Sequence, residues 1–220
     1  MILRFAVTVI SLLVMSVAPM AHAQENPPEA LVKSVTNDVL TALRQDKDIQ
    51  SGNRKRATQL IEDKVAPHFN FQRMTALAVG RSWRDASPNQ QGALVGEFRT
   101  LLVRTYAKAM TAYRDQSVEF PPARSQADDG EVTVRSHVKQ PGGRPVTLDY
   151  RLAKADGAWK VHDVAIENIS LVTNYREAFA AAVRTGGIDG LIQVLQAKNR
   201  VLDEVGDGGR GDAVVQVALR

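Results

Sequence analysis

The chain contains no cysteine, which excludes disulfide bonds and cysteine-ligated metal sites. Its hydrophobic core must therefore supply the stability of the fold. An excess of charge of one sign is also nearly absent, because 28 Lys and Arg residues face 24 Asp and Glu residues, a net charge of +4 at pH 7. Such a mildly basic surface suits an anionic lipid or an acidic partner, and it does not indicate a nucleic-acid-binding protein.

Motifs that carry chemistry are missing as well. The sequence has no Gly-x-Ser-x-Gly elbow, no Walker phosphate loop and no calcium-binding loop. Beyond residue 23 it has three histidines, His68, His137 and His162, and none has a second metal-type ligand two, three or four residues away. His162 stands beside Asp163, but neighbours in a strand point to opposite faces unless a bulge intervenes. We therefore expect no enzymatic activity, no metal and no cofactor.

What the chain does have begins with a leader. Arg4 precedes an apolar run from Phe5 to Ala18, and Ala21-His22-Ala23 has the small-x-small pattern of a signal-peptidase site. We expect residues 1–23 to be a cleaved signal peptide, residues 24–203 to form a single domain, and the Gly- and Asp-rich residues 204–220 to form a flexible tail. No run after residue 23 is expected to be apolar over the roughly 20 residues that a membrane span needs.

Four helices are predicted in the first half of the chain, where apolar residues recur every three to four positions behind a capping residue or a proline. They run from Pro28 to Leu43, from Asn53 to Pro67, from Asn70 to Gly80 and from Ser87 past Met110. The start at Ser87 is the clearest, because Ser87-Pro88-Asn89-Gln90 combines a capping serine, a proline in the first helical position and a glutamine in the third. The first two helices are expected to pack as an antiparallel pair.

From Gln116 onwards the apolar residues alternate with polar ones, which is typical of half-buried strands. Strands are predicted at Ser117–Phe120, Val132–Val138, Val146–Leu152 and Trp159–Ile166. The parity of the apolar positions changes within the last of these strands. A bulge near His162 and Asp163 would explain that change and would bend the strand.

The stretch Asn168–Arg176 connects the last predicted strand to a helical region with almost no spacer. Three of its residues can cap a helix: Ser170, Thr173 and Asn174. A helix is predicted from near Tyr175 to Gly186-Gly187, followed by a last helix that Asp189 caps. The stretch contains no catalytic group, so we expect it to set the angle between sheet and helix.

Several of these segments resemble the MlaC family of periplasmic phospholipid-binding proteins, also called the toluene-tolerance family. The resemblance rests on Pro67-His68-Phe69-Asn70-Phe71 with Met74, on Gly80-Arg81-Ser82-Trp83-Arg84, on the helix start Ser87-Pro88-Asn89-Gln90-Gln91, on Trp159-Lys160-Val161-His162-Asp163-Val164 and on Ser170-Leu171-Val172-Thr173-Asn174-Tyr175-Arg176. The similarity is collinear from about Ala30 to Leu195. Asn168 departs from the pattern, since a glycine is expected there, and the tail beyond Val205 has no clear counterpart.

The resemblance implies an α+β fold in which helices cup a curved, mainly antiparallel sheet of about four strands around a deep apolar lipid cavity. It also implies a periplasmic carrier that shuttles phospholipid between the outer and inner membranes to maintain outer-membrane lipid asymmetry. The implied partners are an outer-membrane lipoprotein–porin complex and an inner-membrane ABC transporter complex with an MCE domain. The carrier is expected to be a monomer.

We expect the cavity to be lined by inward-facing residues of the long helix, the strands and the connecting stretch. The predicted lipid-binding residues are Val79, Trp83, Phe98, Leu101, Leu102, Thr105, Tyr106, Met110, Val134, Val146, Leu148, Tyr150, Trp159, Val161, Val164, Ile166, Ile169, Leu171, Tyr175 and Phe179. Four arginines are candidates for contact with a head group or a partner: Arg81, Arg84, Arg144 and Arg151.

Two other functions remain open at this point. The first is a small periplasmic hydrolase or isomerase with a related cone-shaped cavity, in which His162, Asp163 or Asp149 would act as the base. The second is a structural adaptor whose apolar residues fill a solid core. Whether any of the three candidate bases faces a cavity distinguishes the enzyme from the carrier.

Overall fold

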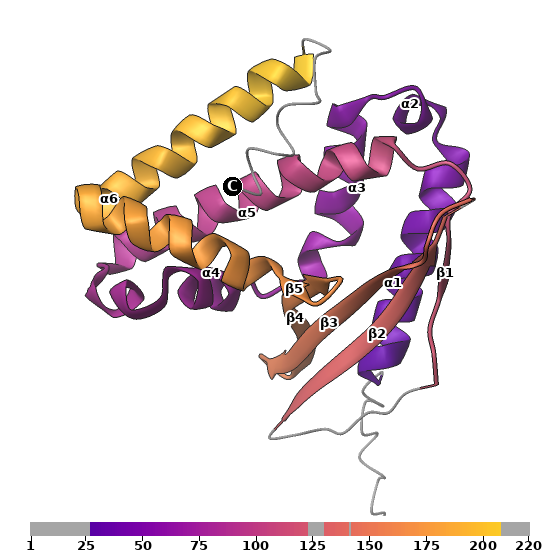
Figure 1. Cartoon of the computed structure of the whole chain (residues 1–220), viewed down its shortest axis with the longest axis horizontal. Helices are drawn as coiled ribbons and strands as arrows, with labels where there is room; N and C mark the ends of the chain where they lie inside the picture. Colours follow the sequence, from indigo (N-terminus) through magenta and orange to yellow (C-terminus); the bar gives the residue numbers. More distant parts are fainter. Residues whose placement is uncertain (1–26, 123–129, 141, 208–220) are drawn as a thin grey trace, which may run out of the picture.

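A computed structural model describes residues 27–122, 130–140 and 142–207 of the chain (Figure 1). Its helices are α1 (Pro28–Gln45), α2 (Lys47–Gln50), α3 (Arg54–Lys64), α4 (Phe71–Val79), α5 (Pro88–Thr111) and α6 (Leu171–Asp207), with 3-10 turns at Ala66–His68 and Gly80–Asp85. Its strands are β1 (Ser117–Glu119), β2 (Glu131–Lys139), β3 (Val146–Ala155), β4 (Ala158–Ile166) and β5 (Ile169–Ser170). The predicted α+β class is confirmed. The sheet has five strands, because the short β5 adds a pair to β4 that sequence alternation did not reveal.

Three helix starts form as their sequences predict. Asn53 and Asn70 each accept a hydrogen bond from the backbone N–H three residues later, at 3.0 Å and 2.9 Å. At the start of α5, Ser87 Oγ accepts from the N–H of Gln90 at 3.3 Å, and Gln90 Oε1 accepts from the N–H of Ser87 at 3.0 Å. This reciprocal pair satisfies two N–H groups that a helix terminus would otherwise leave free.

The strands form one antiparallel sheet in which each strand pairs with its neighbours in the sequence, in the order β1 to β5. Between β3 and β4, Arg151 is opposite Asp163 whereas Leu152 is opposite Val161, so His162 is an extra residue on β4. The predicted bulge is therefore confirmed. It breaks the strict alternation of β4, so that Val161 and Val164 both line the cavity face, while Asp163 lies on the other face opposite Arg151, where it is 3% exposed.

The connection between sheet and helix begins with Asn168 in the left-handed region, at φ +67°. Asparagine tolerates this conformation better than most residues other than glycine, which accounts for its place where the family resemblance expects glycine. Ser170 Oγ then accepts a hydrogen bond from the N–H three residues later at 3.1 Å, so α6 starts at Leu171, four residues earlier than predicted. Asp163 adds a second tie, because its carboxylate accepts a hydrogen bond from the N–H of Val172 at 3.2 Å.

Replacing Asp163 with alanine tests this connection. The buried carboxylate also accepts a hydrogen bond from Arg151 at 3.1 Å, and its loss would leave the buried N–H of Val172 without a partner. We expect Asp163→Ala to lower the free energy of unfolding by about 2–4 kcal/mol, measured by chemical denaturation. The control Glu119→Ala removes an exposed ion pair with Lys139 on the same sheet and should cost less than about 1 kcal/mol. Equal losses in the two variants would contradict the assigned role.

Helix α6 is long but broken. Gly187 has φ +67° and ψ −166°, a conformation outside the helical region, at the end that the Gly186-Gly187 pair predicts. The helix then continues to Asp207, so residues 204–207, which the sequence assigned to the tail, are helical; the leader and residues 208–220 lie outside the described residues.

By length and composition alone, the stretch Leu171–Glu204 passes as a membrane span, which the sequence-based expectation had excluded. The sequence-based expectation was therefore wrong about the composition of this stretch. The break at Gly187 divides the stretch, and both halves contribute buried residues to the interior of the domain: Val172, Tyr175, Phe179, Leu191 and Leu195. Apolar residues at these positions are accounted for by packing within the domain.

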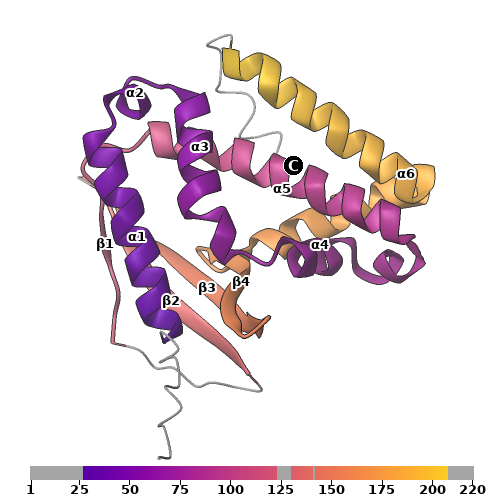
Figure 2. The same ribbon diagram turned by 180° about the vertical axis from the view of Figure 1, so that it is seen from behind.

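Two apolar regions concern the site, in addition to the cluster that packs α1, α2, α3 and α5 together. One is a continuous core between α4, α5 and α6. The other lies where α1, the 3-10 turn at Ala66–His68 and the second half of α5 approach the sheet, and Figure 2 shows α1 crossing in front of β2 and β3. Helix α5 contributes residues to both regions.

Candidate functional site

The region between α1, α5 and the sheet encloses an apolar cavity of about 640 Å³. From α1 it is lined by Leu31, Val32, Val35, Thr36, Val39, Leu40 and Leu43. From α5 and the residues just after it, the lining includes Leu102, Val103, Tyr106, Ala109, Met110, Ala112 and Tyr113. The sheet supplies Val118, Val138, Leu148, Tyr150, Val161, Val164 and Ile166. The cavity is thus built from elements far apart in the chain, from Leu31 in α1 to Ile166 in β4.

The structure places nine of the twenty predicted lipid-binding residues in this lining. They are Leu102, Tyr106, Met110, Leu148, Tyr150, Val161, Val164, Ile166 and Leu171. The other eleven lie elsewhere: Val79, Trp83, Phe98, Leu101, Thr105, Val134, Val146, Trp159, Ile169, Tyr175 and Phe179. The structure does not place these eleven in the cavity lining, and contact of any of the twenty with lipid stays a prediction.

Three of the aromatic residues among the eleven, Phe98, Tyr175 and Phe179, fill the core between α5 and α6. The ring centroid of Phe98 lies 5.1 Å from that of Tyr175 and 5.1 Å from that of Phe179, and both pairs have edge-to-face geometry. All three side chains are buried, and burial raises the pKa of Tyr175 to about 12. Helical periodicity identified these residues as inward-facing, but it could not distinguish a filled interior from a hollow one.

Ile169 is absent from the lining for a different reason, because it is exposed to solvent. Its side chain is 62% exposed, because β5 is only two residues long and lies at the edge of the sheet. The sequence placed Ile169 in the wall by its apolar character and its position beside Leu171. Only Leu171 reaches the cavity.

Sequence reasoning missed the whole contribution of α1 to the cavity. The apolar stripe of this helix was recognised but was assigned to packing against the second helix. A signal was present, since the stripe extends from Leu31 to Leu43 whereas α3 opposes it with fewer apolar residues, from Ala57 to Val65. Helix α1 thus has more apolar surface than α3 can cover. This indicates that part of the stripe faces another apolar region, which in the structure is the cavity.

A few polar groups interrupt the apolar lining. Burial raises the pKa of Tyr106 and lowers the pKa of His68, which the positive charge of Lys160 lowers further. Both shifts favour the neutral form of the side chain at pH 7. The lining residues that are themselves exposed are Ala109, Ala112 and Gln140, so the cavity opens beside the C-terminal end of α5.

The candidate catalytic bases do not line the cavity. Both carboxylate oxygens of Asp149 accept hydrogen bonds of 2.6 Å from Arg135, and Asp163 is engaged by Arg151 and by the start of α6. His162 is buried at the bulge, where burial and then Arg73 lower its pKa. Within the described ranges, no three His, Asp or Glu side chains converge in a way that could hold a metal ion.

Comparison with known proteins shows which family the chain is similar to. The sequence model of the family described as "MlaC protein" matches residues 33–197, about three quarters of the chain. The chain belongs to the MlaC family. The matched range covers all of the lining described above except Leu31 and Val32.

Two members of the MlaC family with curated names are similar to this chain over most of its length. The "Intermembrane phospholipid transport system binding protein MlaC" of Haemophilus influenzae is 23% identical over 177 residues, which cover 78% of this chain and 82% of the relative. The "Toluene tolerance protein ttg2D" of Pseudomonas putida is 24% identical over 180 residues, covering 81% and 83%.

A solved structure also matches. It is a phospholipid-binding protein from Ralstonia solanacearum in complex with a phospholipid, with 40% sequence identity and a TM-score of 0.75. The alignment covers 81% of this chain and 99% of that protein. The family resemblance read from the sequence and the α+β fold that it implied are therefore both confirmed.

Proposed function

We propose that this member of the MlaC family is a periplasmic phospholipid carrier that holds acyl chains in the cavity between α1, α5 and the sheet. The observation that carries the proposal is the apolar cavity itself, in a chain whose structural relative is described in complex with a phospholipid. Its volume of about 640 Å³ falls within the range of about 300–1,000 Å³ that is typical of small-molecule sites.

The energetics of lipid transfer explain why such a cavity is needed. Two acyl chains carry on the order of 30 methylenes, and exposing them to water would cost about 0.8 kcal/mol each, or about 24 kcal/mol in total. Free diffusion across an aqueous gap is then negligible. A carrier whose wall is as apolar as the bilayer interior makes transfer nearly balanced, and this step requires no nucleophile, base or metal.

The wider role follows from the family and the predicted leader. We infer that residues 1–23 direct the protein to the periplasm of a Gram-negative bacterium, where it exchanges phospholipid with two membranes. The partners in this proposal are the outer-membrane lipoprotein–porin complex and the inner-membrane ABC transporter complex with an MCE domain. The exchange would maintain the lipid asymmetry of the outer membrane, and the name of the Haemophilus influenzae relative supports an intermembrane route.

Lipid analysis of the purified protein tests the carrier function directly. We expect the mature chain, purified without detergent and measured by native mass spectrometry, to retain phospholipid, and the delipidated protein to take up phospholipid from liposomes. A soluble protein of similar size without an apolar cavity, purified through the same host extract, provides a control for adventitious lipid. Absence of co-purifying phospholipid together with absence of uptake would contradict the proposal and favour the adaptor.

The enzymatic alternative has no comparable support. Its candidate bases, His162, Asp163 and Asp149, lie outside the cavity lining, and both carboxylates are engaged by arginines. A base that does not face the cavity cannot reach a proton on a ligand held within it.

A further inference from the structure

Polar side chains gather at the open end of the cavity. Tyr113 and Gln116, which follow α5, belong to the lining together with Gln140, which follows β2. Ser117 pairs with Lys139 at the end of the β1–β2 ladder, so Gln116 and Gln140 flank the same pair. Tyr113 Oη donates a hydrogen bond to the backbone carbonyl of Gln116 at 3.3 Å. A ligand with an apolar body would therefore meet its polar surroundings at this end.

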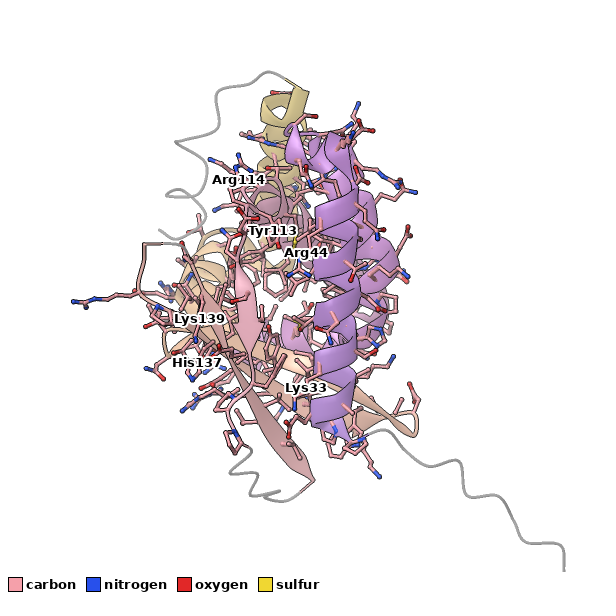
Figure 3. The ribbon with its side chains drawn as sticks, turned by 90° about the vertical axis from the view of Figure 1, so that its right-hand side faces the viewer. Lys33, Arg44, Tyr113, Arg114, His137 and Lys139 are labelled. Carbon is pink, nitrogen blue, oxygen red and sulfur yellow. The ribbon has the colours of Figure 1, made fainter. Side chains whose placement is uncertain are left out.

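Two arginines contact Tyr113 at its two ends. Arg44, in the last turn of α1, donates from Nε to Tyr113 Oη at 3.1 Å. Arg114 donates from Nη1 to the backbone carbonyl of Tyr113 at 2.6 Å. Figure 3 shows Arg44 and Tyr113 next to each other beside the upper part of α1, with Arg114 above them. The buried tyrosine thus links a wall of the cavity to two exposed guanidinium groups.

These two arginines differ from the arginines that are held in ion pairs. Six arginines form ion pairs with carboxylates: Arg56, Arg73, Arg99, Arg104, Arg135 and Arg151. Within the described part of the chain, neither Arg44 nor Arg114 has a carboxylate within ion-pair distance. Each retains N–H groups that can bind an anion, and a guanidinium group matches the geometry of phosphate oxygens.

The end of α5 would repel an anion if Arg114 were absent. The last carbonyls of a helix carry partial negative charge, and an anion near them is disfavoured. Arg114 Nη1 donates hydrogen bonds to the carbonyls of Thr111 and Tyr113. Its positive charge offsets the partial negative charge of the helix terminus. The open end of the cavity is therefore compatible with a phosphate, although it lies at the C-terminal end of a helix.

We propose that Arg44 and Arg114 bind the phosphate of the lipid head group, with Tyr113 positioning Arg44 at the cavity mouth. This inference rests on the proposed function, since it assigns the head group of the same ligand. The phosphodiester is shared by all common glycerophospholipids, so the site selects phospholipid over uncharged lipids with the same acyl chains. It does not select among head groups beyond the phosphate.

Competitive loading of the delipidated mature protein tests this assignment. Vesicles contain equal amounts of phosphatidylglycerol and diacylglycerol with identical acyl chains, and mass spectrometry gives the ratio of the two bound lipids. We expect Arg44→Gln/Arg114→Gln to lower the ratio of phosphatidylglycerol to diacylglycerol about tenfold relative to the parent protein, as expected for the loss of charge-assisted hydrogen bonds. The uptake of diacylglycerol from vesicles that contain no phosphatidylglycerol should not change.

Two further variants separate recognition from folding. Arg44→Gln alone leaves the end of α5 intact and should lower the ratio about threefold, while Arg200→Gln, an exposed arginine on α6, should leave it unchanged. An unchanged ratio in both Arg44 variants would overturn the inference while leaving lipid carriage in place. Failure of the parent protein to take up either lipid would instead overturn the proposed function.

The source of the phosphate is tested in a separate arm. Inorganic phosphate at up to tens of millimolar should not displace phosphatidylglycerol, because it lacks the acyl chains that supply most of the binding free energy. Displacement by inorganic phosphate alone, lost in Arg44→Gln, would identify a free-phosphate site and would overturn the assignment to the lipid head group.

Discussion

Leu148→Asp should reduce lipid loading at least tenfold. Leu148 is a half-buried residue of β3 that lines the cavity, and an ionised carboxylate there would have to lose its water against acyl chains. Burying an unpaired carboxylate costs several kcal/mol, well above the 1.4 kcal/mol that corresponds to a tenfold change in affinity. Protonation of the new side chain would reduce this cost, so the effect should weaken as the pH falls towards 5. Uptake from liposomes, quantified by mass spectrometry, provides the measurement.

Ile169→Asp is the matched control for this prediction. Ile169 is also an apolar residue of the sheet and was also predicted from sequence to line the cavity, but its side chain is 62% exposed. Aspartate at this position stays in water, so loading should remain within about twofold of the parent protein. Equal losses in the two variants would contradict the wall that the structure defines and would restore the assignment made from sequence.

The second large effect concerns stability. Leu101→Ala should lower the free energy of unfolding by about 3–5 kcal/mol, because Leu101 is 2% exposed and packs in the filled core between α4, α5 and α6. Leu40→Ala should cost only about 1 kcal/mol, because one side of Leu40 faces the cavity and has fewer neighbouring atoms to lose. Chemical denaturation of the delipidated proteins compares the same substitution in a filled and in a hollow region.

The outcome of this pair bears on the nature of the cavity. If both substitutions lower the free energy of unfolding by about the same amount, the region beside α1 is as densely packed as the core. A structural adaptor would then be the better explanation. Lipid loading gives a second readout, since Leu101→Ala should leave the loading of the folded fraction unchanged, whereas Leu40→Ala alters the wall.

Local structure followed closely from the sequence. The caps at Asn53, Asn70 and Ser87 act between residues three apart, so their neighbours in the chain are sufficient to predict them. The bulge at His162 was readable for a related reason, because a change in apolar parity within one strand needs an extra residue to keep both halves facing the interior. The start of α6 was placed four residues late, since Ser170 was one of three possible caps.

The site was predicted less completely. The residues of β3 and β4 that line the cavity were identified because a strand of an open sheet has one inner face, and alternation selects it. Helix α5 presents inward residues to two regions, and periodicity alone cannot assign Leu101 to the core and Leu102 to both. The cavity-lining residues of α1 were missed because an apolar stripe on a helix does not by itself show which element packs against it.

The sequence by itself determined that this protein has an amphipathic helical half, an antiparallel sheet with a bent strand and a family resemblance that proved correct. These features depend on periodicity and on contacts between near neighbours in the chain. The tertiary structure alone decided that Phe98, Tyr175 and Phe179 fill a core while α1 and the sheet leave a cavity open. Burial is a sum over contacts between distant segments, and two apolar stripes with the same pattern can be packed together or held apart.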